Sequence, residues 1–245
     1  MFAVIFEVNP RPDQWDTYLS YARSLRPELE QIEGFIDNER FSSLRREGWV
    51  LSLSIWRDEE AVIHWRTAAR HHEIQQKGRS EVFRDYRLRV EEIIADIQLP
   101  GGEQLREEPF DATRAAKLVE LSEAAPADLP PQADAATVAA RLGAPDLAAQ
   151  QGLLAWDAFA SIYQPGKFIL LTSRRDAAAA GSPRHSSNEI RYRRVRIIRD
   201  YGMFDRAEAP QYFPPVALER PARTYSQRAD RRFIISTMID NERGE

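Results

Sequence analysis

The stretch "GFIDNERFSSLRREGWVLSLSIWRDEEA", residues 34–61, contains two segments that alternate between polar and apolar residues, followed by the start of a helix. Such alternation predicts strands, because successive side chains of a strand point to opposite faces. The loop between the two segments ends at Gly48, which accepts the positive φ of a tight hairpin. Asp58 stands where the N-cap of a helix is expected. The stretch therefore predicts a strand, a hairpin, a second strand and a helix.

The flanking residues complete a four-stranded unit. "FAVIFEVN" alternates like a strand, and apolar residues recur at steps of three or four along the segment that follows it. The resulting order, β-α-β-β-α-β, is the ferredoxin-like arrangement. The expected outer elements are a strand at 2–9, a helix at 15–32, a helix from 58 through 72 and a strand at 83–94.

An ungapped alignment at an offset of 118 pairs residues 34–61 with "GLLAWDAFASIYQPGKFILLTSRRDAAA", residues 152–179. Both glycines, the hairpin and the arginine–aspartate pair at the helix start recur in register. "KLVELSEA" then matches the first strand and "IRYRRVRII" the fourth, with Tyr192 aligned to Tyr86 at an offset of 106. We interpret the match as an internal duplication whose second copy has shortened helices, which leaves one competent site per chain.

The sequence thus predicts an α+β chain of two ferredoxin-like β-α-β-β-α-β repeats. Leu51, Leu53 and Ile55 form an apolar row that would be exposed unless the two sheets faced one another, so we expect a pseudo-dimeric α+β barrel within one chain. A further pairing of two chains into a homodimer stays open. The expected divisions are a first repeat at 1–98, a linker at 99–113, a degenerate second repeat at 114–203 and an extended C-terminal tail at 204–245.

Composition restricts the class of protein. Of the 245 residues, 43% are hydrophobic and 29% charged, as in ordinary soluble globular proteins. The net charge of -4 argues against nucleic acid as a partner, and the absence of cysteine excludes disulfides, thiolate catalysis and cysteine-ligated metals. The sequence lacks the long apolar run of a membrane span, and "MFAVIFEVNP" lacks the basic start of a signal peptide. We therefore expect a cytoplasmic protein.

The strand entry "EGFIDNERF", the junction "SIWRDEEAVIHW" and the following "HHEIQQKGR" resemble the antibiotic biosynthesis monooxygenase (ABM) family of the dimeric α+β barrel superfamily. The resemblance covers residues 1–95 well and reaches, more weakly, to about 203. It implies a cleft between the sheet and the two helices of one unit. Some members of the family oxygenate anthrones without metal or flavin, and others bind haem and open its ring. In tandem members, the second repeat replaces the partner subunit.

The resemblance also implies a role for one tryptophan. Trp65 matches the helix tryptophan that lines the cleft, where it forms a wall against a flat substrate; the alternative is a core residue. Trp56, at a strand end, is a second lining candidate whose alternative is packing. His71 and His72 are adjacent on the expected helix and point about 100° apart, so only one of them should face the cleft. Either imidazole suits a proton acceptor; the alternative is a helix-surface position.

Three further candidates lie on strands. Asn38 and Arg40 share a face of the second strand with Ile36. A polar group aimed into an apolar cleft stabilises an enolate or peroxide anion, so Asn38 is a candidate catalytic residue and Arg40 a candidate substrate-binding residue. Tyr86 on the fourth strand is a candidate hydrogen-bond donor to the same ligand. The alternative for all three is a solvated or half-buried sheet face.

We therefore expect a cofactor-independent monooxygenase that uses O2 to oxidise a small aromatic substrate such as a quinol or anthrone. The alternative from a different class is a non-catalytic protein that binds a small molecule or assembles. Haem degradation is disfavoured because Gln75 stands where haem-degrading members have their axial histidine, and Glu7 where they have an asparagine. The sequence holds no metal-binding or nucleotide-binding motif. The expected partners are the substrate and O2, without nucleic acid or membrane.

Overall fold

The computed structural model describes residues 1–103, 105, 118–147, 150–175 and 189–210. The first repeat follows the predicted order, with a short 3₁₀ turn before its first helix and its second helical region divided in two. Its elements are β1 (Phe2–Pro10), α1 (Trp15–Leu29), β2 (Phe35–Ser43), β3 (Val50–Trp56), α2 (Glu59–Thr67), α3 (Ala69–Lys77) and β4 (Phe83–Asp96). Those of the second repeat are β5 (Leu118–Ala124), α4 (Ala135–Arg141), β6 (Leu153–Ser161), β7 (Phe168–Arg174) and β8 (Arg191–Gly202).

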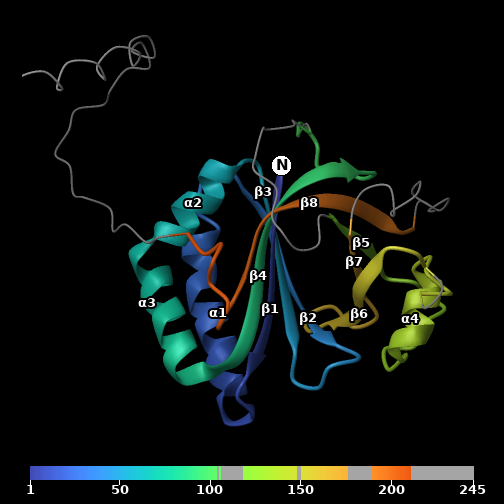
Figure 1. Ribbon diagram of the computed structural model, residues 1–245, viewed down its shortest axis with the longest axis horizontal. Helices are drawn as coiled ribbons and strands as arrows, with labels where there is room; N and C mark the ends of the chain where they lie inside the picture. Colours follow the sequence, from blue (N-terminus) through green and yellow to red (C-terminus); the bar gives the residue numbers. More distant parts are fainter. Residues whose placement is uncertain (104, 106–117, 148–149, 176–188, 211–245) are drawn as a thin grey trace, which may run out of the picture. The chain divides into compact units, whose positions relative to one another are not determined.

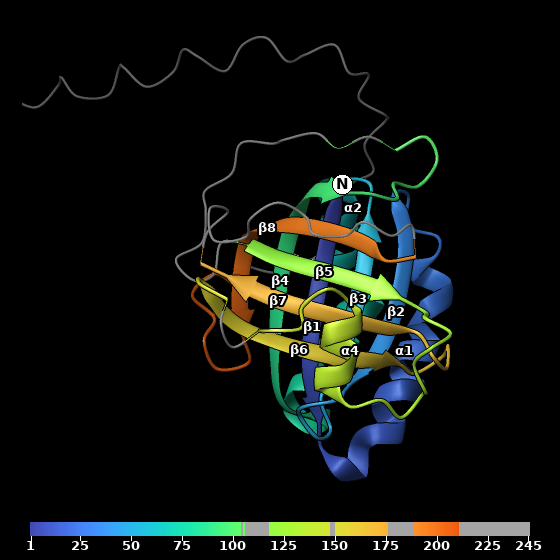
Figure 2. The ribbon, with the colours of Figure 1, turned by 90° about the vertical axis from the view of Figure 1, so that its right-hand side faces the viewer.

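The strands close into one barrel in the order β1-β3-β2-β6-β7-β5-β8-β4. Each repeat contributes a four-stranded antiparallel sheet, β4-β1-β3-β2 in the first and β8-β5-β7-β6 in the second, and this is the ferredoxin-like strand order in both. The two sheets join where β2 pairs with β6 and β4 pairs with β8 (Figure 2). The chain is therefore a pseudo-dimeric α+β barrel, as predicted.

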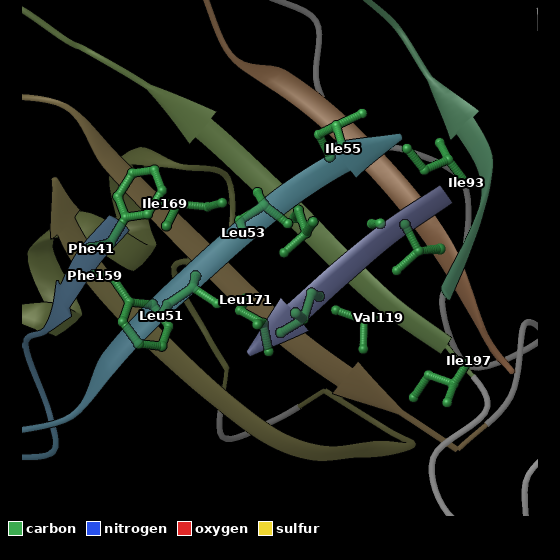
Figure 3. Close-up of a cluster of buried hydrophobic side chains, with 14 of the residues drawn as sticks. Phe41, Leu51, Leu53, Ile55, Ile93, Val119, Phe159, Ile169, Leu171 and Ile197 are labelled. Carbon is green, nitrogen blue, oxygen red and sulfur yellow. The ribbon is translucent and has the colours of Figure 1, made fainter. Parts of the chain in front are cut away.

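Apolar side chains from both repeats fill the inside of the barrel (Figure 3). The row Leu51, Leu53 and Ile55 lies within this cluster at 0%, 4% and 3% exposure, and Ile169 and Leu171 of the second repeat lie with it. Each sheet thus supplies the apolar surface that the other one covers, which is the reason a single repeat needs a partner.

A pseudo-two-fold relation is visible where β2 meets β6. Ser43 Oγ donates to Asp157 Oδ2 at 2.8 Å, and Ser161 Oγ donates to Glu39 Oε1 at 2.6 Å. The two contacts are images of one another under the offset of 118 found in the sequence. The backbone pairing has the same relation, with Phe41 opposite Ser161 and Ser43 opposite Phe159. Such a self-complementary contact is what a symmetric dimer interface would leave after duplication within one chain.

The pairing of β4 with β8 is symmetric about Glu92, which lies opposite Arg196, and this corresponds to an offset of 104. Equivalent ion pairs flank the centre on both sides: Arg87 with Asp200 at 2.5 Å, and Arg191 with Asp96 at 2.9 Å. The interface between the repeats therefore combines the shared apolar core with matched, partly buried charges.

This register corrects one detail of the sequence match. Leu88 lies opposite Phe6 in the first repeat, and Tyr192 lies opposite Ser122, which occupies the place of Phe6 in the second. Tyr192 is thus the counterpart of Leu88, two residues away from the expected Tyr86. Because the shift is even, Tyr192 keeps the expected sheet face.

Helices α1, α2 and α3 cover the outer face of the first sheet, and α4 packs on the second (Figure 1). No helix of the described residues is long and apolar enough to cross a membrane. The expected second helix of the second repeat, most of the linker at 99–113 and most of the tail at 204–245 lie outside the described residues. The division into domains and the homodimer stay predictions.

Candidate functional site

A cavity of about 260 Å³ lies between the outer face of the first sheet and its helices. Ligand pockets usually span roughly 300–1,000 Å³, so this cavity suits a small molecule. Its walls include apolar and aromatic side chains such as Phe6, Leu25 and Val62. All seven residues predicted from the sequence line it: Asn38, Arg40, Trp56, Trp65, His71, His72 and Tyr86.

On the sheet side, Asn38 is held by three hydrogen bonds. Its Nδ2 donates to the carbonyl of Leu53 at 3.0 Å and to Ser52 Oγ at 3.2 Å. Its Oδ1 accepts from Nη1 of Arg40 at 2.9 Å. Both amide N–H groups are thus engaged within the protein, which leaves Asn38 without a donor for a substrate oxygen. This geometry suits a residue that orients Arg40.

Ile36 does not share the face of Asn38 and Arg40. A bulge between Phe35 and Asp37 interrupts the pairing with β3, and Ile36 packs against the apolar cluster inside the barrel. The expected alternation therefore fails at this residue, because a bulge adds a residue to one strand and shifts the faces that follow.

Trp56 is both a packing and a lining residue. Its side chain is almost fully buried, its Nε1 donates to Ser54 Oγ at 2.9 Å, and its ring meets Phe35 edge to face. A buried indole N–H normally requires such a partner. The two interpretations offered by the sequence are therefore compatible at this position.

The helix that carries Trp65 ends earlier than predicted. At Ala68 the backbone leaves the helical region, with φ −59° and ψ 125°, and α3 starts at the next residue. The prediction of one continuous helix from 58 through 72 is therefore wrong. His71 and His72 are adjacent on α3 and both line the cavity, so the expectation that only one of them faces the cleft is wrong.

His71 stacks on Trp65, with ring centroids 4.1 Å apart and planes 15° from parallel. Its Nδ1 lies 2.8 Å from the carbonyl oxygen of Trp65. A carbonyl only accepts, so the proton resides on Nδ1 and Nε2 keeps its lone pair. Burial lowers the pKa of His71 to about 4, against the opposing effect of the Trp65 carbonyl. The imidazole is therefore neutral at pH 7 and able to accept a proton at Nε2.

His72 is engaged differently. Nε2 of Gln76 lies 3.0 Å from Nε2 of His72, and since an amide nitrogen only donates, the imidazole nitrogen is the acceptor. The lone pair that a base would use is thus already occupied in His72. Of the two histidines, His71 has the geometry that a proton acceptor needs.

The sequence analysis missed several polar lining residues, among them Arg206 and Tyr18. Arg206 donates from Nη1 to the hydroxyl of Tyr86 at 2.5 Å, and it comes from the segment that was assigned to the extended tail. Tyr18 of α1 also lines the cavity, with its side chain 6% exposed. No spacing in the sequence links residue 206 to the first repeat.

The positions related to haem ligation hold residues that do not fit that role. Glu7 accepts hydrogen bonds from Arg46 and Arg89 and is not among the cavity residues. Gln75 lines the cavity but carries an amide, which is not a usual axial ligand. Among the described residues, no three His, Cys, Asp or Glu side chains come close enough to hold a metal ion.

Comparison with known proteins identifies the family. The family model for antibiotic biosynthesis monooxygenases matches residues 1–77. A curated relative from Pyricularia oryzae, named jasmonate monooxygenase ABM, is 46% identical over 226 residues, which is 89% of this chain and 100% of the relative. The chain therefore belongs to the antibiotic biosynthesis monooxygenase family.

Solved structures show a related fold at low identity. An aldoxime dehydratase crystallised with butyraldoxime is 10% identical, with 80% of this chain and 79% of that chain covered and a TM-score of 0.51. A crystal structure of an antibiotic biosynthesis monooxygenase is 17% identical, with 37% of this chain and 95% of that chain covered and a TM-score of 0.34. The similarity to the aldoxime dehydratase concerns the fold alone.

Proposed function

We propose that the protein is a monooxygenase that oxidises a small, largely apolar molecule in the cavity of the first repeat, with His71 as proton acceptor. The observation that carries the proposal is the neutral imidazole, whose Nδ1 is bonded to the carbonyl of Trp65 and whose Nε2 is left as a base. A base that removes a proton from carbon or oxygen leaves an electron-rich anion, which is the species that reacts with O2 in the absence of a cofactor.

The stoichiometry of such a reaction constrains the substrate. Conversion of a CH2 group and O2 to a carbonyl group and water balances without a reductant, because the substrate supplies all the electrons. Insertion of a single hydroxyl needs two further electrons from a donor. Independence from a cofactor thus favours a substrate with an activated CH2 group, such as the anthrone expected from the sequence.

The name of the Pyricularia oryzae relative points to a second substrate type, jasmonate. The identity of 46% makes a jasmonate-like compound a substrate candidate beside quinols and anthrones. Trp65 and Trp56 would contact the body of either ligand, and Tyr86 would donate to a substrate oxygen. Cofactor independence and a cytoplasmic location stay predictions.

The test is oxygen uptake by the full-length protein with anthrone, hydroquinone and jasmonate, with and without an added reductant, in metal-free and flavin-free buffer. We expect uptake with at least one substrate, lost in His71→Ala and kept in His64→Ala, whose imidazole is exposed on α2. Uptake that is unchanged in His71→Ala would contradict the assigned base.

A parallel titration with haem checks the cofactor. A haem absorption band that appears with the wild type and not with His71→Ala would identify the imidazole as an axial ligand instead of a base. Binding of a substrate that quenches tryptophan fluorescence without any oxygen uptake would favour the non-catalytic binding protein.

A further inference from the structure

The cavity has an unusual balance of charge. The described residues that line it include arginines but no aspartate or glutamate, although the chain has 38 acidic and 34 basic residues. Such a cavity favours an anion over a neutral molecule, since each cation placed in apolar surroundings loses hydration that a counter-ion restores. The arginines that line the cavity are Arg40, Arg66, Arg79 and Arg206.

Arg40 stands out because it is half-buried and, among the described residues, has no carboxylate within ion-pair distance. Its Nε is buried without a hydrogen-bond partner, and its Nη1 donates to the neutral amide of Asn38. An arginine side chain stays charged at any accessible pH. The guanidinium therefore retains donors for an oxygen anion.

Other buried arginines of the barrel behave differently. Arg89 contacts Glu7, Arg193 contacts Glu123, and both guanidinium groups are at most 2% exposed. These two buried guanidinium groups each have a carboxylate, whereas Arg40 has none among the described residues. A counter-charge supplied by the ligand explains it.

A second donor lies beside Arg40. The hydroxyl of Tyr18 is buried beside the Arg40 guanidinium, and its proton has no acceptor within the described part of the chain. Burial raises the pKa of Tyr18, with Arg40 nearby acting in the opposite direction, so the phenol is neutral and keeps its proton. A buried O–H without an acceptor is destabilising, and a ligand oxygen that accepted from it would remove that cost.

We propose that the cavity binds an apolar organic monocarboxylate, with its carboxylate held by Arg40 and the hydroxyl of Tyr18. Two convergent donors match the two oxygens of a carboxylate. Asn38 is a positioning residue, because its amide is fixed on Leu53 and Ser52 and its oxygen orients Arg40. The acid group is then bound on the sheet wall, while His71 approaches the body of the ligand from the helix wall. This inference rests on the proposed function for the assignment of the cavity as the substrate site.

The test uses equilibrium binding and needs no turnover. The probes are 1-naphthylacetate and its neutral isostere 1-naphthylacetamide, titrated calorimetrically into the full-length protein at pH 7. A charge-assisted pair is worth about 1.5–3 kcal/mol, so the wild type should bind the acid at least about tenfold more tightly than the amide. In Arg40→Met the two should bind within about threefold of each other, while binding of the amide changes little.

Four further variants keep the experiment decisive. Arg84→Met removes an equal charge from an exposed position of β4 outside the cavity and should preserve the preference for the acid. Tyr18→Phe should weaken acid binding more than amide binding, and Asn38→Ala should do so partially. Circular dichroism at 25 °C checks that each variant is folded, and Arg40→Lys, which keeps the charge, should retain part of the preference if Arg40→Met is unstable.

Equal affinity of acid and amide in the wild type, no measurable binding of the acid at millimolar concentration, or a preference that survives in Arg40→Met would each overturn the proposal. The outcomes separate it from the proposed function. An Arg40-dependent preference for the acid without oxygen uptake would uphold the carboxylate site and contradict the monooxygenase. Oxygen uptake with a neutral anthrone and no preference for the acid would do the reverse.

Discussion

The two repeats share a strand order and differ in what occupies the outer face of each sheet. In the first repeat, the cavity lies on this face, with Val4 and Trp56 in its lining. At the corresponding positions of the second repeat stand Glu120 and Arg174, which form an ion pair. Arg194, at 3.0 Å, and the hydroxyl of Tyr192 complete the contacts of the Glu120 carboxylate. Equivalent backbone positions thus carry cavity-lining apolar groups in one repeat and mutually paired charges in the other.

The covering helices differ in parallel. Three helices, α1 to α3, cover the first sheet, and α4, with seven residues, is the described helix on the second. In the first repeat, the cavity occupies the space between the helices and the sheet. In the second repeat, the charged residues on the sheet bond one another and therefore need no ligand. In the function proposed above, the first repeat holds the reaction site. The second repeat takes the place of a partner subunit and completes the barrel core.

The largest expected effect concerns the base of the first repeat. Replacement of His71 by alanine should lower kcat by about 10²–10⁴-fold, the usual contribution of a positioned general base. His72→Ala should have a smaller effect, because its Nε2 already accepts from Gln76. Oxygen-uptake rates at saturating substrate measure both variants. A larger loss of kcat in His72→Ala than in His71→Ala would indicate that His72 is the base.

The next effect is on stability and distinguishes the charges of the two repeats. Glu120→Gln should lower the free energy of unfolding by about 3–5 kcal/mol, because it leaves Arg174 and Arg194 without their carboxylate. Arg40→Met should change the free energy of unfolding by about 1 kcal/mol or less, since the substitution removes only a hydrogen bond to the neutral amide of Asn38. Urea denaturation at pH 7 measures both, and comparable losses would contradict the contrast drawn between the two outer faces.

A third effect concerns the inside of the barrel, where Glu91 of the first repeat corresponds to Val195 of the second under the offset of 104. Glu91 is fully buried with both carboxyl oxygens unpaired, and burial raises its pKa to about 8. The folded state therefore holds a proton that the unfolded state releases above about pH 4.5. Its contribution to stability is present below pH 4.5 and is lost as the pH rises towards 8.

Glu91→Gln removes this dependence. Relative to the wild type, the variant should gain stability between pH 5 and pH 8, by roughly 3–4 kcal/mol. Urea denaturation at several pH values measures the difference in the free energy of unfolding. Glu92→Gln is not a suitable control, because Glu92 forms an ion pair with Arg196. A constant difference between Glu91→Gln and the wild type across this range would show that Glu91 does not titrate there.

The smallest expected effect is a nearly flat pH profile. Because burial lowers the pKa of His71 to about 4, the base form is fully populated above pH 5. The value of kcat/KM should then vary by less than about twofold between pH 5.5 and 7.5, with its acid limb near pH 4, provided that the substrate does not titrate in this range. An inflection near 6.5, the ordinary pKa of histidine, would indicate a solvent-exposed base such as His72.

Much of this arrangement follows from local patterns in the sequence. The recurrence of Gly34 as Gly152 and of Gly48 as Gly166 marks turns that adopt positive φ in both repeats, at 89°, 73°, 75° and 85°. Side-chain alternation in β3 placed Leu51, Leu53 and Ile55 inside the barrel, and Trp65 was correctly expected near the cleft. These features depend on short-range periodicity, which a single sequence contains.

The remainder depends on contacts between distant residues or on breaks in periodicity. The extended conformation at Ala68 places His71 against Trp65, and the neighbouring residues carry no proline or glycine that would indicate it. The sequence likewise gives no sign of the bulge near Ile36. Arg206 reaches Tyr86 across 120 positions. Among the described residues, no carboxylate pairs with Arg40, and this depends on the folded cavity and not on a sequence motif.

The stoichiometry of binding shows whether each chain has one ligand site, located in the first repeat. Calorimetric titration of the full-length protein with 1-naphthylacetate, or with its amide if the cavity prefers neutral ligands, gives the number of sites. We predict one molecule per chain, with binding abolished in Ala22→Trp, which fills the cavity from α1, and retained in Ala140→Trp on the exposed face of α4. Two molecules per chain, or undiminished binding in a folded Ala22→Trp, would contradict the account.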